Sequence, residues 1–125
     1  MNISARIGRA YELMRTGRLE DALELLEEDI STTASHLERD TLRYLLYRQK
    51  DRSQDALQVA EACLKQPLTD TQKSTWLLRQ GFALLELRRK TDAARAFHAV
   101  MSVPGQKDQH QQAREALLRL TDMEA

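Results

Sequence analysis

The sequence predicts an all-α fold, an α-solenoid of three helix-turn-helix pairs followed by a C-terminal capping helix. An Asp-Ala dipeptide recurs at residues 21, 55 and 92, and each copy opens a short apolar helical pattern. Recurrence at 34 and then 37 residues is typical of stacked helical pairs. The chain also has only four glycines and two prolines, and Ala, Leu, Glu, Gln and Arg are frequent, which favours helix over sheet.

The expected helix boundaries come from capping and breaking residues. Ser35 with Glu38, and Thr69 with Gln72, are capping-box patterns, in which two side chains satisfy backbone N–H groups at a helix start. The two prolines follow the fourth and sixth helices and stop them, because proline cannot continue the backbone hydrogen bonds. We expect seven helices, over residues 3–15, 19–30, 35–49, 53–65, 70–87, 92–101 and 107–120.

The length favours one domain. A chain of 125 residues can bury a continuous core but is too short for two domains of ordinary size. We therefore expect a single domain over residues 1–125, with repeats at 3–34, 37–67 and 70–104 and a capping helix at 107–122. The apolar residues of the last helix form one stripe, which consists of Ala113, Ala116, Leu117 and Leu120.

Charge and hydropathy indicate which classes of partner the chain is expected to bind. Lys plus Arg and Asp plus Glu are 19 each, so no net field attracts nucleic acid or an anionic membrane. No stretch approaches the roughly 20 apolar residues of a membrane span, and no basic segment followed by an apolar run opens the chain. We expect a cytoplasmic protein that binds neither nucleic acid nor membrane. The basic run at residues 88–90 keeps an RNA-binding helical repeat as a less favoured alternative.

The residues that could carry chemistry are scattered. His36, His98 and His110 lie on three different expected helices, and none has a second ligand at metal-binding spacing on its face. Cys63 falls at an inward-packing position, which predicts a structural role rather than a reactive thiol. The glycines are isolated, so no phosphate-binding loop is expected. We therefore expect no catalytic residue, no cofactor and no metal, and a protein that is not an enzyme.

The fifth expected helix is apolar nearly all round, whereas an ordinary surface helix has one apolar stripe of about 100°. Its apolar residues are Trp76, Leu77, Leu78, Gly81, Phe82, Ala83, Leu84, Leu85 and Leu87. Such a helix must be buried on two sides. One side faces its own partner helix, and the other faces neighbouring repeats or a ligand.

Small and large residues in the third helical pair form a familiar pattern. Gly81 and Ala93 suit a close approach of two helices, and Phe97 fills the space beside them. With this pattern the chain resembles the tetratricopeptide repeat family, although leucines stand at the family's signature Trp and Tyr positions. The residues at or close to the family's pattern positions are Leu77, Gly81, Leu84, Ala93, Phe97 and Pro104 in the third pair, Ala56, Ala60 and Pro67 in the second, and Gly17, Ala22 and Leu26 in the first.

The resemblance implies a concave groove lined by the first helix of each pair. Carried over position by position, the groove residues are Ile7, Tyr11, Met14, Leu42, Leu45, Leu78, Arg79, Phe82 and Leu85. The implied function is a protein–protein interaction module, adaptor or chaperone-like, that binds a peptide or an amphipathic helix of a partner protein in this groove. The alternative is a module that self-associates through an exposed repeat edge, as a homo-oligomer or scaffold.

Overall fold

The protein is all-helical in the part of the chain that the computed structural model describes, residues 2–28 and 36–124. The predicted all-α class is therefore confirmed for these residues, which contain helices and no strand. The helices, in chain order, are α1 (Ile3–Arg15), α2 (Leu19–Glu27), α3 (Leu37–Gln49), α4 (Ser53–Leu64), α5 (Asp70–Glu86), α6 (Lys90–Met101) and α7 (Lys107–Glu124).

The helix ends agree with the sequence in most places. The Thr69–Gln72 capping box is present, with both reciprocal hydrogen bonds formed at the start of α5. Ser35 lies outside the described residues, and the N-cap of α3 is His36, whose Nδ1 accepts from the backbone N–H of Arg39 at 3.3 Å. Helix α6 begins two residues earlier than expected, α7 extends four residues beyond residue 120, and α4 and α5 each end one residue earlier. Helix α2 ends at Glu27, and residues 29 and 30 of its expected range lie outside the described residues.

Residues 1–52 form one compact unit and residues 53–125 a second. In the first unit α1 and α2 pack side by side through small and branched apolar residues, and α3 contacts both of them. Polar contacts join the same helices, since the Tyr47 hydroxyl donates to Glu27 at 2.6 Å and Lys50 pairs with Glu20. The expected second repeat, 37–67, spans residues of both units, and the single-domain assignment stays a prediction.

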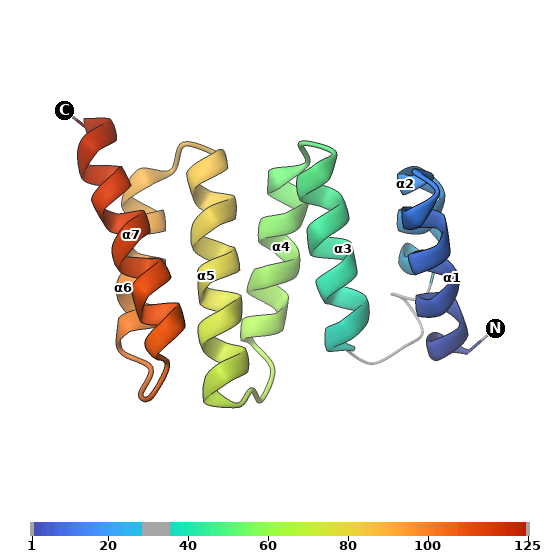
Figure 1. Cartoon of the computed structure of the whole chain (residues 1–125), viewed down its shortest axis with the longest axis horizontal. Helices are drawn as coiled ribbons and strands as arrows, with labels where there is room; N and C mark the ends of the chain where they lie inside the picture. Colours follow the sequence, from blue (N-terminus) through green and yellow to red (C-terminus); the bar gives the residue numbers. More distant parts are fainter. Residues whose placement is uncertain (1, 29–35, 125) are drawn as a thin grey trace. The chain divides into compact units, whose positions relative to one another are not determined.

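In the second unit α5 packs against α4 on one side and α6 on the other, and α7 packs against α6 (Figure 1). The two-sided burial predicted for this helix is confirmed, because α4 and α6 cover different parts of it. Trp76, Leu77 and Leu84 of α5 are buried, together with Phe97 and Val100 of α6. The α6–α7 contact completes this unit and positions the surface described below.

One turn geometry recurs after α1, α3 and α5. Each turn has a residue at positive φ, which lets the chain reverse while the last helical carbonyls keep hydrogen-bond partners. These residues are Gly17 (φ 80°), Asp51 (φ 57°) and Arg88 (φ 61°). In every case the next residue is arginine, and its N–H donates to the carbonyl oxygen five residues back. The pairs are Arg18 to Leu13 (2.8 Å), Arg52 to Tyr47 (2.8 Å) and Arg89 to Leu84 (2.9 Å).

No described helix combines the length and the apolar character that crossing a membrane requires.

Candidate functional site

A furrow runs between α6 and α7, and one part of it is lined mainly by apolar atoms. It consists of two adjoining depressions of about 410 and 320 Å³, which share His98, Leu117 and Thr121. The remaining lining residues are Lys90, Thr91, Ala94 and Leu120 in the first depression, and Met101, Arg114 and Leu118 in the second.

The spacing of residues on α7 creates this furrow. Ala113, Ala116 and Leu120 recur at three and four residues, which places them on one helix face, and all three are buried. Leu117 borders this stripe and is only half-buried, although the sequence predicts it within the stripe. Leu118 is turned farther from the stripe. The alanines bring α7 close to α6, so the longer side chains beside them form the walls of a hollow.

Two apolar side chains of the furrow are exposed. Leu118 is 67% exposed and Met101 is 37% exposed. Exposed apolar surface on a helical repeat invites association. Single exposed leucines are ordinary, but here Leu118 and Met101 line the same concavity as Leu117.

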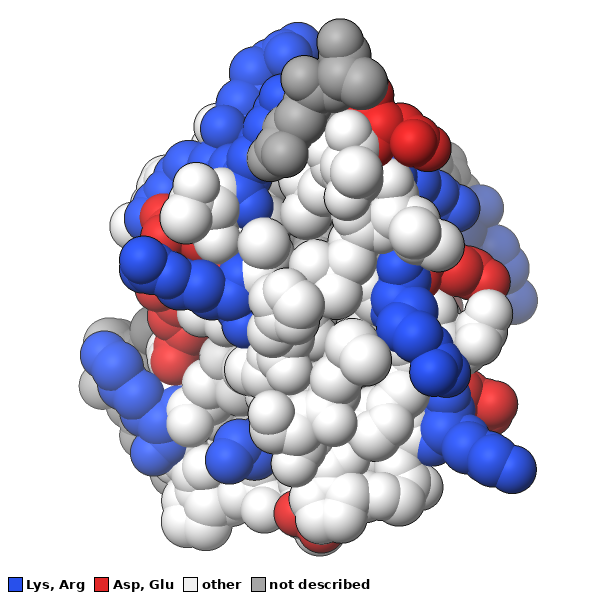
Figure 2. All heavy atoms as spheres, turned by 90° about the vertical axis from the view of Figure 1, so that its left-hand side faces the viewer, with Lys and Arg blue, Asp and Glu red and all other residues white. Residues whose placement is uncertain are grey.

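The charges at the furrow have one sign. Lys90 and Arg114 are its only charged lining residues within the part of the chain that the structure describes. The Arg114 guanidinium makes one long contact, 3.5 Å to the side-chain oxygen of Gln111. Figure 2, which faces the α6–α7 side, shows a broad uncharged surface with Lys and Arg side chains on both sides of it and Asp and Glu side chains among them.

The groove residues predicted on α5 occupy varied environments. Leu78 is buried, whereas Phe82 and Leu85 are half-buried. The Phe82 ring meets the Phe97 ring edge-on with centroids 5.2 Å apart, so Phe82 belongs partly to the α5–α6 packing. The Arg79 guanidinium lies 4.5 Å from the centre of the Trp76 ring. These residues therefore offer less free apolar surface than the sequence alone suggests.

The groove residues predicted on α1 and α3 belong to the first unit. Ile7 and Leu42 are buried. Tyr11 and Leu45 are 49% and 41% exposed, and Met14 is half-buried. The nine predicted residues are divided between the two units, and their use as one groove stays a prediction.

The sequence reasoning missed the residues that form the furrow. The sequence pattern places Leu117 in the buried stripe of the last expected helix, and it places Met101 at the end of the sixth expected helix. The available signal was the Leu117-Leu118 pair: consecutive residues on a helix lie about 100° apart, so a helix that packs through one stripe covers one of the two less fully.

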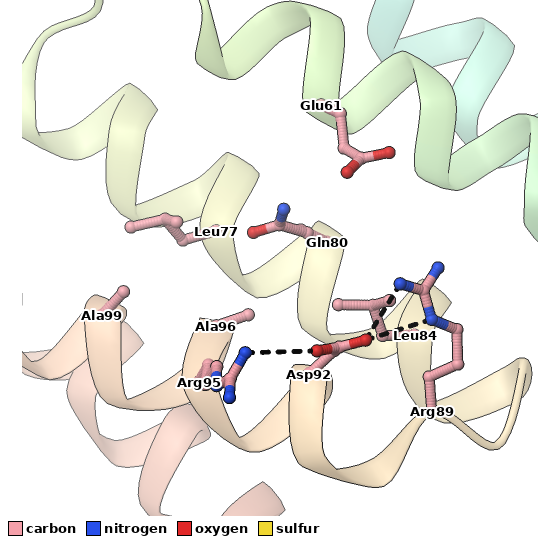
Figure 3. Close-up of a pocket in the computed structure, with 9 residues that line it drawn as sticks. All are labelled: Glu61, Leu77, Gln80, Leu84, Arg89, Asp92, Arg95, Ala96 and Ala99. Atoms are coloured by element: carbon pink, nitrogen blue, oxygen red, sulfur yellow. Dashed lines mark hydrogen bonds and ion pairs between the residues drawn. The ribbon is translucent and has the colours of Figure 1, made fainter.

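A second hollow, of about 310 Å³, lies over α4, α5 and α6 (Figure 3). Its floor includes Leu77 and Leu84, and Glu61 reaches toward it from α4. Asp92 accepts from Arg89 at 2.9 Å and lies 3.7 Å from Arg95, so the charges at this rim largely neutralise one another. The hollow is less apolar than the α6–α7 furrow and lacks its charge bias.

The histidines and the cysteine have structural settings. His110 Nε2 lies 2.7 Å from the carbonyl oxygen of Val103, His36 caps α3, and Cys63 is buried. His98 alone of the three lines the furrow. Within residues 2–28 and 36–124 no group of three or more His, Cys, Asp or Glu side chains could hold a metal ion.

Comparison with protein-family models gave no match, and comparison with curated protein sequences gave none either.

Proposed function

We propose that this chain is a protein–protein interaction module of tetratricopeptide-like helical pairs, and that it binds a helical segment of another protein in the α6–α7 furrow. The observation that carries the proposal is the exposed apolar wall formed by Leu118 and Met101 in a concavity. A helix that lays its apolar side into such a furrow is a common mode of peptide recognition.

The recurring turn supports the repeat assignment. Three turns with the same backbone geometry are each followed by the Asp-Ala dipeptide at the same offset, so the period seen in the sequence is matched by local structure. In two of them the arginine after the turn also pairs with that aspartate, Arg18 with Asp21 at 2.7 Å and Arg89 with Asp92 at 2.9 Å. Repeats of this kind act by presenting extended binding surfaces.

The energetics favour a transient complex. Full burial of an exposed leucine contributes about 1.5 to 3 kcal/mol, and association costs at least about 4 kcal/mol in lost freedom of motion. Leu118 alone therefore cannot hold a partner. Met101, Leu117 and the charged rim must contribute with it, which suits the affinity of an adaptor or a chaperone-like protein rather than of a permanent subunit.

Self-association is the second candidate, and the same observation favours it. A second copy could cover Leu118 and Met101 through its own α7. Sedimentation at several concentrations separates the two functions, because a self-associating module dimerises as its concentration rises and loses this behaviour in Leu118→Asp.

Site-specific photocrosslinking in the native cell tests the proposal. A photoreactive residue at position 121, which lines the furrow, should give a covalent product with another protein, and one at exposed position 112, on α7 but outside the furrow, should give none. Leu118→Asp should remove the product and Leu118→Met should retain it. If a reactive residue at position 82 crosslinks instead, and does so in Leu118→Asp as well, the partner uses the groove on α5 and the furrow is not the binding surface.

A further inference from the structure

We infer that the occupant of the α6–α7 furrow is an amphipathic helix whose apolar stripe is bordered by carboxylates, that is, an acidic helical segment of a partner protein. The inference rests on the proposed function and specifies the chemistry of its partner. It is carried by the positions of Lys90 and Arg114 and by the aliphatic lining between them.

The two basic residues lie in different parts of the furrow. Lys90 lines only the first depression and Arg114 only the second, while the apolar Leu117 is shared by both. Lys90 is the first residue of α6 and Met101 is the last, so the furrow extends along a helix of 12 residues. Such a helix is about 18 Å long. A partner helix of about three turns fills this length, with one carboxylate near each basic residue.

Lys90 and Arg114 differ from the neighbouring basic residues, because those neighbours are paired with an aspartate. On and beside α6, the guanidinium groups of Arg89 and Arg95 are both within ion-pair distance of Asp92. Lys90 and Arg114 have no ion pair with any residue that the structure describes. The acidic side chains of α7 that the structure describes, Asp108, Glu115 and Asp122, do not line the furrow. A carboxylate on the partner would thus meet an uncompensated positive charge at each end.

The lining distinguishes a peptide from nucleic acid, which is also negatively charged. Proteins that hold single-stranded nucleic acid stack its bases on aromatic rings. The walls here are Met101, Leu117 and Leu118, and the described residues of the furrow include no Phe, Tyr or Trp. Flexible aliphatic and thioether side chains instead suit the apolar stripe of a helix.

Helix α2 is the acidic helix that a second copy of this chain could offer to the furrow, and the burial of its apolar residues disfavours it. The acidic helix α2 carries Glu20, Asp21 and Glu24, but its apolar residues Leu23 and Leu26 are buried in the first unit. Helix α2 of a second copy could not present that stripe without unfolding, so α2 does not supply the acidic helix.

Two designed peptides test the inference with the full chain. Both have 16 residues and leucines at positions i, i+3, i+4, i+7 and i+11, and the flanking positions are glutamate in one and lysine in the other. Fluorescence anisotropy at low salt should show the glutamate peptide binding about tenfold more tightly, since each exposed ion pair contributes modestly. The advantage should shrink as salt rises and screens the charges.

Variants separate this inference from the proposed function. Lys90→Gln with Arg114→Gln should remove the preference, and Lys90→Glu with Arg114→Glu should reverse it, with circular dichroism to verify folding. Leu118→Asp should weaken both peptides. If both peptides bind equally and depend on Leu118, the acidic partner is wrong and the proposed function stands. If neither peptide binds, or binding ignores Leu118→Asp, the inference is overturned. A dimer that Leu118→Asp dissociates would also overturn it, because a second copy would then occupy the furrow.

Discussion

Phe97 of α6 covers Gly81 of α5 so closely that a Cβ atom on Gly81 would lie 2.6 Å from Cε1 of the phenylalanine ring. Real Cβ atoms do not approach other heavy atoms to this distance, so the glycine is required by packing. The Phe97 ring is fully buried and meets the Phe82 ring at 5.2 Å, which limits its freedom to move away. The missing side chain of Gly81 thus sets the separation of α5 and α6.

Replacing Gly81 by alanine should destabilise the protein. Overpacking costs about 1 to 3 kcal/mol, which outweighs the gain of at most about 1 kcal/mol in helix propensity. Gly8→Ala is the matched control: Gly8 is also helical, and a Cβ there would have nothing within 4 Å. Urea unfolding should show a lower midpoint for Gly81→Ala and a higher one for Gly8→Ala. Stabilisation by both substitutions would contradict the close contact.

The same region shows how far the sequence could lead. The sequence predicted Gly81 and Ala93 at a tight crossing of two helices, with Phe97 filling the space beside them. In the structure the atoms that crowd Gly81 belong to Phe97 itself, and Ala93 is buried as expected. Residue size and spacing indicate that two helices approach closely. The rotation of each helix, which decides which side chain faces which, depends on packing that no local pattern encodes.

The furrow was not predictable for a related reason. Periodicity identifies which residues of α7 face inward, and Ala113, Ala116 and Leu120 are buried as expected. Whether Leu117 and Leu118 are then covered depends on how α6 lies beside them, and this is a tertiary property. For the groove inferred from family resemblance, the sequence pattern selects residues that are not exposed. Ile7, Leu42 and Leu78 fit the family pattern and are buried.

Arg88, in the turn after α5, has a positive φ of 61°. The equivalent residue in the turn after α1 is Gly17, with a φ of 80°. A non-glycine residue in this region costs about 1 kcal/mol or more, because its Cβ approaches a backbone oxygen. Arg88→Gly removes this cost, but the flexibility that glycine adds to the unfolded chain offsets part of the gain. We therefore expect Arg88→Gly to stabilise the protein by at most about 1 kcal/mol. Gly17→Ala should have the opposite sign. Urea midpoints measure both changes, and a loss of stability in Arg88→Gly would show that the arginine side chain makes compensating contacts.

We expect Tyr47 to make the folding stability of the protein fall at alkaline pH. Burial, and then the hydrogen bond to Glu27, raise the pKa of the Tyr47 phenol above its ordinary value of about 10. The folded chain therefore holds this proton more tightly than the unfolded chain does. The resulting contribution to stability is fully present below about pH 10 and is lost as pH rises through the higher folded-state pKa.

The test is the pH dependence of urea unfolding in Tyr47→Phe. At neutral pH the variant loses the 2.6 Å hydrogen bond to Glu27 and should be about 1 to 2 kcal/mol less stable. Above pH 10 the gap between the two proteins should narrow, because only the wild type loses the contribution of the protonated phenol. Parallel curves for the two proteins would show that the pKa of Tyr47 is not raised.

Two leucines on α7 allow the role of the furrow in folding to be measured directly. Leu120 is 5% exposed and Leu118 is 67% exposed, although they are two residues apart on the same helix. Leu120→Ala removes buried contacts and should cost about 2 to 5 kcal/mol, whereas Leu118→Ala should change stability by no more than about 0.5 kcal/mol. Urea unfolding followed by circular dichroism gives both values under the same conditions. A side chain that contributes little to folding is free to contribute its full apolar area to a complex. If Leu118→Ala were as destabilising as Leu120→Ala, Leu118 would belong to the core, and no apolar wall would remain for a partner to cover.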